Sequence, residues 1–165
     1  MSDAPSLIAL IPRLRRYARA LVGDRAAADD LVQDTLERAW TKLHLFRRGT
    51  DLRAWLFTVM HNVRVNQLRA ARPTDALEDD MPELAQRATQ GDALLVRDLE
   101  RAIAALPVAQ REVLLLVALE DLSYEEAAQV LGIPIGTVMS RLARAREKLR
   151  LSMTGKGGTL LQVVK

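Results

Sequence analysis

The stretch SYEEAAQVLGIPIGTVMSRLARAREKLR, residues 123–150, is typical of two short helices separated by a turn. Ser123 followed by Glu126 is a capping box, in which each side chain bonds the backbone N–H of the other residue, so a helix begins here. Gly132 supplies the left-handed residue that commonly ends a helix, and Pro134 suits the first turn of the next one. The stretch therefore predicts a helix, a short turn and a second helix.

The second helix has two distinct faces on a wheel of about 100° per residue. The apolar stripe consists of Val138, Leu142, Ala145 and Leu149. An adjacent arc holds no large apolar side chain and no acid, with Glu147 only at its edge; its members are Thr137, Ser140, Arg141, Arg144 and Lys148. In a helix-turn-helix such a face lies in the major groove, where Arg reads guanine and Ser, Thr and Lys hold phosphates. A solvated amphipathic helix is the alternative, but the coincidence of capping box, turn and arc favours DNA binding.

The composition limits the kind of protein. The chain has 165 residues, of which 49% are hydrophobic, enough for one or two small domains with cores. It has no cysteine, which excludes disulfides and thiolate metal sites and agrees with a reducing compartment. The first twenty residues lack the apolar core of a signal peptide, and no apolar run approaches the roughly 18 residues that span a bilayer. We therefore expect a soluble, cytoplasmic protein without membrane insertion.

Charge is distributed unevenly along the chain, whose net charge is +3. Residues 1–72 contain 13 Lys and Arg against 7 Asp and Glu, residues 73–106 contain 3 against 8, and residues 107–165 contain 8 against 6. Two basic blocks separated by an acidic one suggest two modules that face nucleic acid.

The first basic block predicts three helices, over residues 7–21, 24–43 and 51–71, with Gly23 closing the first and Asp24 capping the second. Apolar residues recur at helical spacing in each. The inward faces are expected to be Leu7, Leu10, Ile11, Leu14, Tyr17, Ala18 and Leu21; then Leu31, Val32, Leu36, Ala39, Trp40 and Leu43; then Leu52, Trp55, Leu56, Val59, Met60 and Val63. Such helices with short connections make a bundle.

The rest of the chain predicts a second helical domain. Residues 73–91 are acidic, are interrupted by Pro82 and Gly91, and read as a flexible linker. One helix is expected through Leu94 to Leu106 and another from Pro107 to Leu119, before the helix-turn-helix. The expected fold is therefore all-α: a three-helix domain over residues 1–72, the linker, a four-helix domain over residues 92–151, and a mobile tail over residues 152–165.

Enzyme chemistry is not indicated. No Gly-rich phosphate loop follows a strand, and no nucleophile elbow is present. His44 and His61 have no partner at metal-ligand spacing, so we expect no metal and no cofactor. The acids Asp29, Asp30, Asp34 and Glu37 spread over the solvent side of their helix, which favours a solvated or partner-binding face over a metal centre.

Three segments together resemble a known family. DDLVQDTLERAWTKLHLF (29–46), GTDLRAWLFTVMHNVRVNQLRA (49–70) and LPVAQREVLLLVALEDLSYEEAAQVLGIPIGTVMSRLARAREKLR (106–150) are similar to the extracytoplasmic-function (ECF) sigma factors, small two-domain promoter-recognition subunits of bacterial RNA polymerase. The motif blocks occur in the family's order and cover residues from about 5 to 150. The extra regions of housekeeping sigma factors are lacking, as is typical of this group.

The resemblance implies roles for the first domain. Residues 29–42 match the region-two helix that docks on the β′ clamp helices of core RNA polymerase, which makes Asp30, Gln33, Asp34 and Glu37 the expected contacts. The loop 44–50 and the next helix match the part that opens the −10 element and captures an extruded base. The expected −10 residues are Arg47, Arg48, Arg53, His61, Asn62, Arg64, Asn66 and Arg69, with Arg72 adding charge. An amide such as that of Asn62 can read the edge of a flipped base. For Asn62 and Asn66 the less favoured alternative is a plain exposed helix surface. Trp55 is expected to pack in the core rather than stack on a base.

For the second domain, the resemblance makes residues 137–148 the helix that reads the −35 element, and it implies contact with the β flap of the polymerase. The expected partners are thus core RNA polymerase, promoter DNA and an anti-sigma factor. Two other classes stay open from the residues alone: a stand-alone helix-turn-helix regulator, which would normally need a dimer to read paired half-sites, and a sigma-like decoy that only binds a regulator.

Overall fold

The computed structural model describes residues 4–71 and 91–154, and its regular elements over these ranges are all helical. The first unit contains α1 (Ala4–Ala9), α2 (Ile11–Val22), α3 (Arg25–Thr41), the short 3₁₀ helix η1 (Leu43–Leu45) and α4 (Leu52–Ala71). Helix α3 packs against both α2 and α4, which forms the expected bundle. Arg72, residues 73–90 of the predicted linker and residues 155–165 of the predicted tail lie outside the described ranges, whereas Gly91, the last residue of the predicted linker, is the first residue of α5 (Gly91–Ala104).

Local chemistry explains the helix ends of this unit. The expected helix over residues 7–21 is in fact two helices, because Pro12 has no N–H to continue the ladder and the chain breaks at Leu10. Gly23 ends α2 in the left-handed conformation, with φ 86°. Asp24 then caps α3 by accepting from the backbone N–H of Ala27 at 3.0 Å.

The core of the bundle is largely as predicted, with one clear exception. Leu14, Tyr17 and Leu21 of α2 are buried, as are Leu31 and Val32 of α3. In α4 the buried residues are Leu56, Phe57, Val59, Met60 and Val63, so Phe57 joins the expected set. Trp55 is half-buried against this core, as expected. The prediction for Trp40 is wrong: its side chain is 61% exposed, because on α3 it points to the side of Gln33 and Glu37 and not to the side of the buried Ala39.

The second unit contains α5 (Gly91–Ala104), α6 (Val108–Leu114), the π-helical turn η3 (Leu115–Leu119), α7 (Tyr124–Leu131) and α8 (Ile135–Thr154). The capping box at Ser123 and Glu126 is present in both directions, at 3.0 and 2.8 Å. Gly132 has φ 67°, as the left-handed end of α7 requires. The helix-turn-helix of residues 123–150 is therefore confirmed.

Two features of this unit differ from the sequence expectation. The helix expected over residues 107–119 changes to π geometry after Leu114, and the N–H of Glu120 then donates to the carbonyl of Leu115 at 3.0 Å. Helix α8 continues to Thr154, with Met153 buried, so the first residues of the predicted tail are helical. On α5 several apolar residues remain exposed: Leu94, Leu95, Val96 and Leu99.

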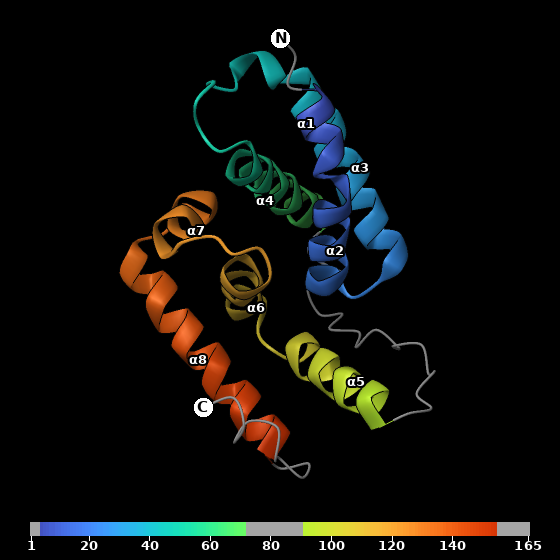
Figure 1. Cartoon of the computed structure of the whole chain (residues 1–165), viewed down its shortest axis with the longest axis vertical. Coiled ribbons are helices and arrows are strands. Elements are labelled where there is room, and N and C mark those ends of the chain that lie inside the picture. The colour runs from blue at the N-terminus through green and yellow to red at the C-terminus, as the bar shows by residue number, and fades with distance from the viewer. Residues whose placement is uncertain (1–3, 72–90, 155–165) are drawn as a thin grey trace.

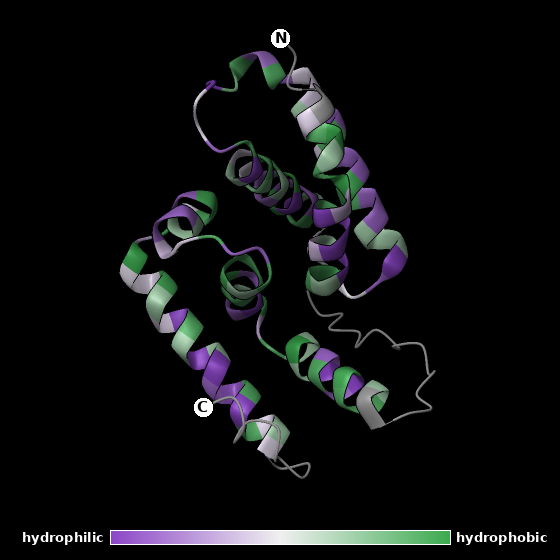
Figure 2. Ribbon diagram, in the orientation of Figure 1, coloured by the Kyte–Doolittle hydropathy of each residue, from purple (hydrophilic) through white to green (hydrophobic). Residues whose placement is uncertain are grey.

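The two units pack directly on each other. Figure 1 shows α1 to α4 on one side and α5 to α8 on the other, with α4 facing α7 and α2 facing α5 and α6. Their buried apolar residues form one continuous cluster that includes Tyr17 and Phe57 from the first unit and Leu115 and Leu116 from the second. Hydrophobic residues follow the facing sides of the helices, whereas α3 and the last turns of α8 carry many hydrophilic ones (Figure 2).

Candidate nucleic-acid and polymerase interfaces

The polar arc of α8 lies on the surface of the second unit. Val138, Leu142 and Ala145 are buried against α6 and α7, which turns the opposite side of the helix outward. Ser140, Arg144 and Lys148 are exposed, while Thr137 and Arg141 are half-buried. Because α8 rises about 1.5 Å per residue, this arc spans roughly three turns, a length that fits a major groove. The structure thus brings together all five predicted −35 residues on one face.

A separate ion pair sits at the edge of this arc. Arg150 donates to both carboxylate oxygens of Glu147, at 2.6 and 3.2 Å. These hydrogen bonds lower the pKa of Glu147 and raise the pKa of Arg150. The pair neutralises two exposed charges, so the positive charge available to a ligand on this side of α8 comes from Arg141, Arg144 and Lys148.

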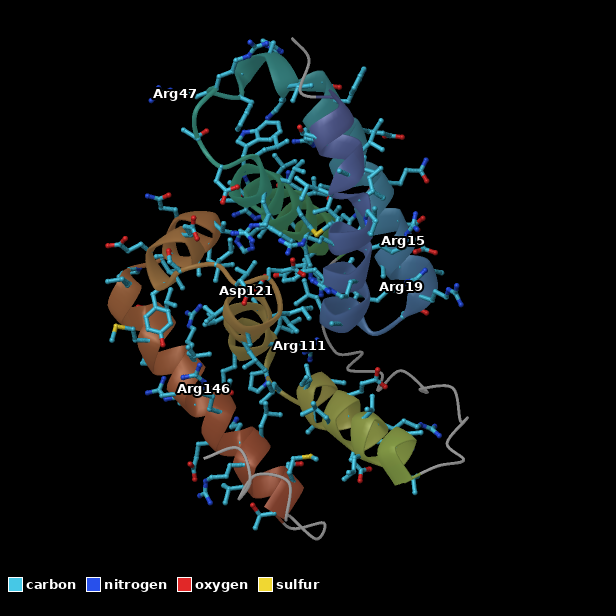
Figure 3. All side chains as sticks on the ribbon, viewed as in Figure 1. Arg15, Arg19, Arg47, Arg111, Asp121 and Arg146 are labelled. Atoms are coloured by element: carbon cyan, nitrogen blue, oxygen red, sulfur yellow. The ribbon has the colours of Figure 1, made fainter. Side chains whose placement is uncertain are left out.

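The loop between η1 and α4 carries the first predicted −10 residues. Arg47 and Arg48 are exposed, and Figure 3 shows Arg47 at the outer edge of the loop. The loop is held from within: Thr50 Oγ1 donates to the carbonyl of Arg47 at 2.6 Å, and the ring of Phe46 packs on Trp55 with centroids 5.4 Å apart. Trp55 is therefore a support for the loop that carries the exposed residues Arg47 and Arg48.

Helix α4 divides the remaining −10 residues between two faces. Asn62, Asn66 and Arg69 fall within about 60° of one another on the helix wheel, and all three are exposed. Arg53, His61 and Arg64 fall within about 80° on a different face and are half-buried. The structure therefore does not gather the predicted −10 residues into one surface.

The face of α4 that carries Arg53, His61 and Arg64 packs against the second unit. His61 Nδ1 lies 3.2 Å from Oε2 of Glu112 in α6, a hydrogen bond in which the imidazole donates. Burial lowers the pKa of Arg64, and the nearby carboxylate of Glu112 opposes that effect. Glu112 thus bonds one of the predicted DNA-binding residues, His61, and acts electrostatically on a second, Arg64.

The acidic stripe of α3 is exposed over its length, including Asp30, Gln33, Asp34 and Glu37. Gln67 of α4 donates to Asp34 Oδ2 at 2.8 Å, which fixes this carboxylate at the rim of a groove of about 490 Å³ between α3 and α4. Glu37 and Asn66 line the same groove. The predicted polymerase contacts and one predicted −10 residue are therefore neighbours.

Three residues of these surfaces were missed by sequence reasoning. Trp40 was assigned to the core, yet on the wheel it lies near Gln33 and Glu37, and that position was a usable signal. The roles of Gln67 and Glu112 depend on contacts between residues 33 and 51 positions apart in the chain. No local pattern reports such contacts.

Residues 4–71 and 91–154 contain neither a metal-binding cluster of acidic, His or Cys side chains nor a membrane-spanning helix. No group of three or more His, Cys, Asp or Glu side chains in these ranges could hold a metal ion. None of the helices there combines the length and apolarity needed to cross a membrane.

Comparison with known proteins identifies both units. Residues 7–61 match the family described as the Sigma2 domain of PhyR, and residues 97–149 match Sigma-70, region 4. The chain is 39% identical over 145 residues to the ECF RNA polymerase sigma factor EcfG of Rhodopseudomonas palustris, a match that covers 87% of this chain and 80% of that protein.

Solved structures of similar fold point to the same family. The sigma factor RpoE of Bartonella quintana, in complex with the anti-sigma factor NepR, superimposes with a TM-score of 0.80 at 35% identity over 92% of this chain and 96% of that one. CnrH, in complex with the cytosolic domain of CnrY, superimposes with a TM-score of 0.66 at 28% identity over 92% of this chain and 87% of that one.

A helical bundle with an exposed acidic stripe, combined with a helix-turn-helix that exposes a cationic arc, defines a promoter-recognition protein. The chain belongs to the ECF family of RNA polymerase sigma factors. It is therefore a promoter-directing subunit of RNA polymerase and not a stand-alone helix-turn-helix regulator. Sigma factors are initiation factors without catalytic activity of their own.

Proposed function

We propose that α8 reads the −35 element of the promoters that this sigma factor serves, through Thr137, Ser140, Arg141, Arg144 and Lys148. The observation that carries the proposal is the geometry of α8, whose apolar stripe is buried while this arc is turned outward. Arg141 and Arg144 are placed to bond guanine edges, and Lys148, one turn further on, to hold a phosphate.

The −10 element is assigned to the exposed face of α4 and the preceding loop. Asn62 and Asn66 carry amides that can read the edge of an extruded base, and Arg47, Arg48 and Arg69 supply charge for the single-strand backbone. Their common exposure supports this assignment. Arg53, His61 and Arg64 lie on the other face of α4, so their proposed contacts are to a different part of the −10 DNA and require that the covering unit move away.

The β′ clamp helices of core polymerase are proposed to bind the exposed stripe of α3, which is formed by Asp30, Gln33, Asp34 and Glu37. The β flap of the polymerase is proposed to bind the second unit. Trp40 extends the stripe. A large exposed aromatic beside charged residues is typical of an interface anchor. The chain would work in the cytoplasm, with the polymerase, and without any catalytic role.

An anti-sigma factor is proposed as the regulatory partner, since the structurally similar sigma factor RpoE was solved with the anti-sigma factor NepR. A groove of about 810 Å³ lies between α2 and α5, with an apolar floor that includes Ile103 and Leu119. Arg15, Arg19 and Arg25 line one side, and exposed leucines of α5 continue the apolar surface. The groove suits an amphipathic helix with acidic flanks.

The expected affinities explain why the polymerase is needed. If α8 contributes about four phosphate contacts, the salt slope of duplex binding is only about −3.6, and non-specific binding at physiological salt is near 10⁻⁴ M. Two weak modules fixed on one large partner gain roughly 10²- to 10⁴-fold from effective concentration. The chain should therefore bind promoters tightly only when it is seated on core polymerase.

The test is reconstituted transcription. Core polymerase, the full chain and a library of genomic fragments should give specific run-off products, and the bound fragments should share two elements at a fixed spacing. A double variant Arg144→Ala, Lys148→Ala should lose these products, whereas Arg146→Ala, on another face of α8, should keep them. Tight and specific promoter binding by the free chain, with no response to core polymerase, would overturn the proposal in favour of an autonomous regulator.

A further inference from the structure

Gln67 of α4 bonds an acid that belongs to the proposed polymerase surface. Its Nε2 donates to Oδ2 of Asp34 on α3 at 2.8 Å, so the bond joins two helices that pack on each other (Figure 1). Val63, one turn earlier on α4, is buried and lines the same groove, and Gln67 itself is half-buried. The Gln67 amide is therefore held against α3, and it restricts the rotamers of the carboxylate that it bonds.

Asp34 is the member of the α3 stripe that another helix holds in place. Within residues 4–71 and 91–154, the side chains of Asp30, Gln33 and Glu37 make no hydrogen bond or ion pair. The Gln67 amide carries no charge, so its bond orients the Asp34 carboxylate without neutralising it. A carboxylate has two oxygens, and Oδ1 stays available to accept from a partner. Asp34 is thus an oriented acid that keeps its charge.

Arg38 is the cation that could neutralise Asp34. The two residues lie one turn apart on α3, a spacing at which Asp and Arg form an ion pair on a helix, and both line the groove of about 490 Å³. In the part of the chain that the structure describes, Arg38 nevertheless has no ion pair, and Asp34 bonds Gln67. The bond to Gln67 thus directs the carboxylate away from Arg38.

We propose that Gln67 is a positioning residue of the polymerase interface: its amide fixes the Asp34 carboxylate in the orientation that a cationic side chain of core polymerase meets, and withholds it from Arg38. This inference rests on the proposed contact between Asp34 and the polymerase. A side chain that is already ordered loses less conformational entropy on binding, and an unpaired carboxylate has no ion pair to break first. Both effects raise the affinity for core polymerase without any contact between Gln67 and the partner.

The experiment is a double-mutant cycle in the full chain, with binding to core polymerase measured by competition against the labelled wild type. Gln67→Met keeps the length of the side chain and removes its donor, and Asp34→Ala removes the carboxylate. Gln67→Met should weaken binding about three- to tenfold, the effect of ordering one further side chain on association. Asp34→Ala should weaken it by at least as much, and the double variant should match Asp34→Ala within about twofold.

The control for the cycle is Gln129→Met, which makes the same chemical change at an exposed position of α7. Because Gln129 lies outside the proposed binding surfaces, this variant should keep the affinity for core polymerase within about twofold of the wild type. A loss in Gln129→Met equal to that in Gln67→Met would mean that the effect is not specific to the contact with Asp34, and would overturn the proposal.

A second cycle tests the role of Arg38. Once Gln67→Met has freed the carboxylate, Asp34 can pair with Arg38, and Arg38→Gln removes that competitor. Arg38→Gln should therefore raise the affinity of Gln67→Met for core polymerase by more than it changes the affinity of the wild type. An equal effect in the two backgrounds would refute the claim that the amide withholds Asp34 from Arg38.

Promoter opening at saturation separates the positioning role from a direct contact with DNA, because Asn66 precedes Gln67 and lines the same groove. When core polymerase is saturated with the variant chain, Gln67→Met should give the same permanganate reactivity of unpaired thymines as the wild type. At a limiting concentration of the chain it should give less. Reduced opening at saturation would assign Gln67 to the DNA surface and overturn the positioning role.

Failure of this inference and failure of the proposed function give different results. If Asp34→Ala weakens polymerase binding but Gln67→Met does not, or if the two losses multiply in the double variant, Gln67 does not act through Asp34 and the inference is refuted. If Asp34→Ala itself binds core polymerase like the wild type, the proposed contact of Asp34 is refuted instead. Gln67→Ala repeats the cycle if circular dichroism shows that Gln67→Met does not fold.

Discussion

Arg16 in α2 and Glu120 after η3 form an ion pair of 3.2 Å in which the carboxylate is completely buried and the guanidinium is half exposed. Arg16 also donates to the carbonyl of Leu119, at 3.5 Å. The π-helical turn places Glu120 at this position, because its N–H bonds Leu115 instead of continuing an α-helix. The pair links the stability of the two units, since removing Arg16 leaves the buried carboxylate of Glu120 unpaired.

Replacement of Arg16 tests this link. Arg16→Gln leaves the buried Glu120 without its cation, which costs several kcal/mol for fully buried pairs and less here because Arg16 is half exposed. We expect the free energy of unfolding in urea to fall by about 1–3 kcal/mol. The neighbouring exposed Arg15→Gln should change it by less than about 0.5 kcal/mol. Equal effects of the two variants would show that the pair does not contribute.

Gly132 at the turn of the helix-turn-helix can be compared with Gly136, which lies inside α8. Gly132 has φ 67°, and a Cβ there or at the helical Gly136 would meet no atom within 4 Å. Gly132→Ala should therefore destabilise the second unit by about 1–2 kcal/mol from backbone conformation alone. Gly136→Ala should stabilise it by up to about 1 kcal/mol, because alanine is the better helix former. Thermal unfolding monitored by circular dichroism measures both, and shifts of the same sign would contradict the assignment of the turn.

Salt dependence tests the role of the α8 arc. Arg144→Ala and Lys148→Ala should each reduce the slope of log K against log salt by about 0.9 for a 20-bp duplex, if each cation neutralises one phosphate. Arg146 is exposed on a different side of α8 and provides the control. A change of slope in Arg146→Ala as large as in the other two would mean that the helix binds DNA in another orientation.

Trp40 tests the polymerase surface. Because its side chain is 61% exposed, Trp40→Ala should leave the unfolding free energy within about 0.5 kcal/mol of the wild type. Loss of an interface anchor should nevertheless weaken binding to core polymerase by about 2 kcal/mol, or roughly 30-fold. Ile8→Ala, at an equally exposed apolar residue of α1, is the control. Competition between unlabelled variants and the labelled wild type for core polymerase gives the affinities, and unchanged competition by Trp40→Ala would remove Trp40 from the interface.

The two asparagines of α4 test the −10 assignment. Asn62→Ala and Asn66→Ala remove exposed amides without touching the core. Polymerase binding should stay unchanged for Asn62→Ala, and it is measured separately for Asn66→Ala because Asn66 lines the groove of Asp34 and Glu37. Promoter opening, followed by permanganate reactivity of unpaired thymines, should fall about tenfold for each variant, the value of one lost base contact. Val65→Ala lies on the same helix and should open promoters normally. Full opening by the double asparagine variant would assign base capture to other residues.

Local sequence determined most of the secondary structure and the direction of most side chains. The capping box at Ser123 and the left-handed Gly132 depend on chemistry within a few residues, so they could be read without knowledge of the fold. The arc of α8 followed from helical period alone, because its apolar stripe leaves one side free. The apolar character of Trp40 misled, since its place on the helix wheel is beside the exposed Gln33 and Glu37 and not on the buried side of α3.

The tertiary structure decided how the predicted sites are used. All the −10 candidates lie in one segment of sequence, yet α4 turns Asn62 and Asn66 to solvent and His61 and Arg64 toward Glu112. Helical period alone separates these two faces, but which of them is covered depends on a contact between residues 51 positions apart, which local patterns do not encode. The sequence by itself determined that the chain forms helices with cationic and acidic faces, because helical period and capping act locally. Only the packing of the two units decided which of those faces remain open, because burial is a property of the assembled fold.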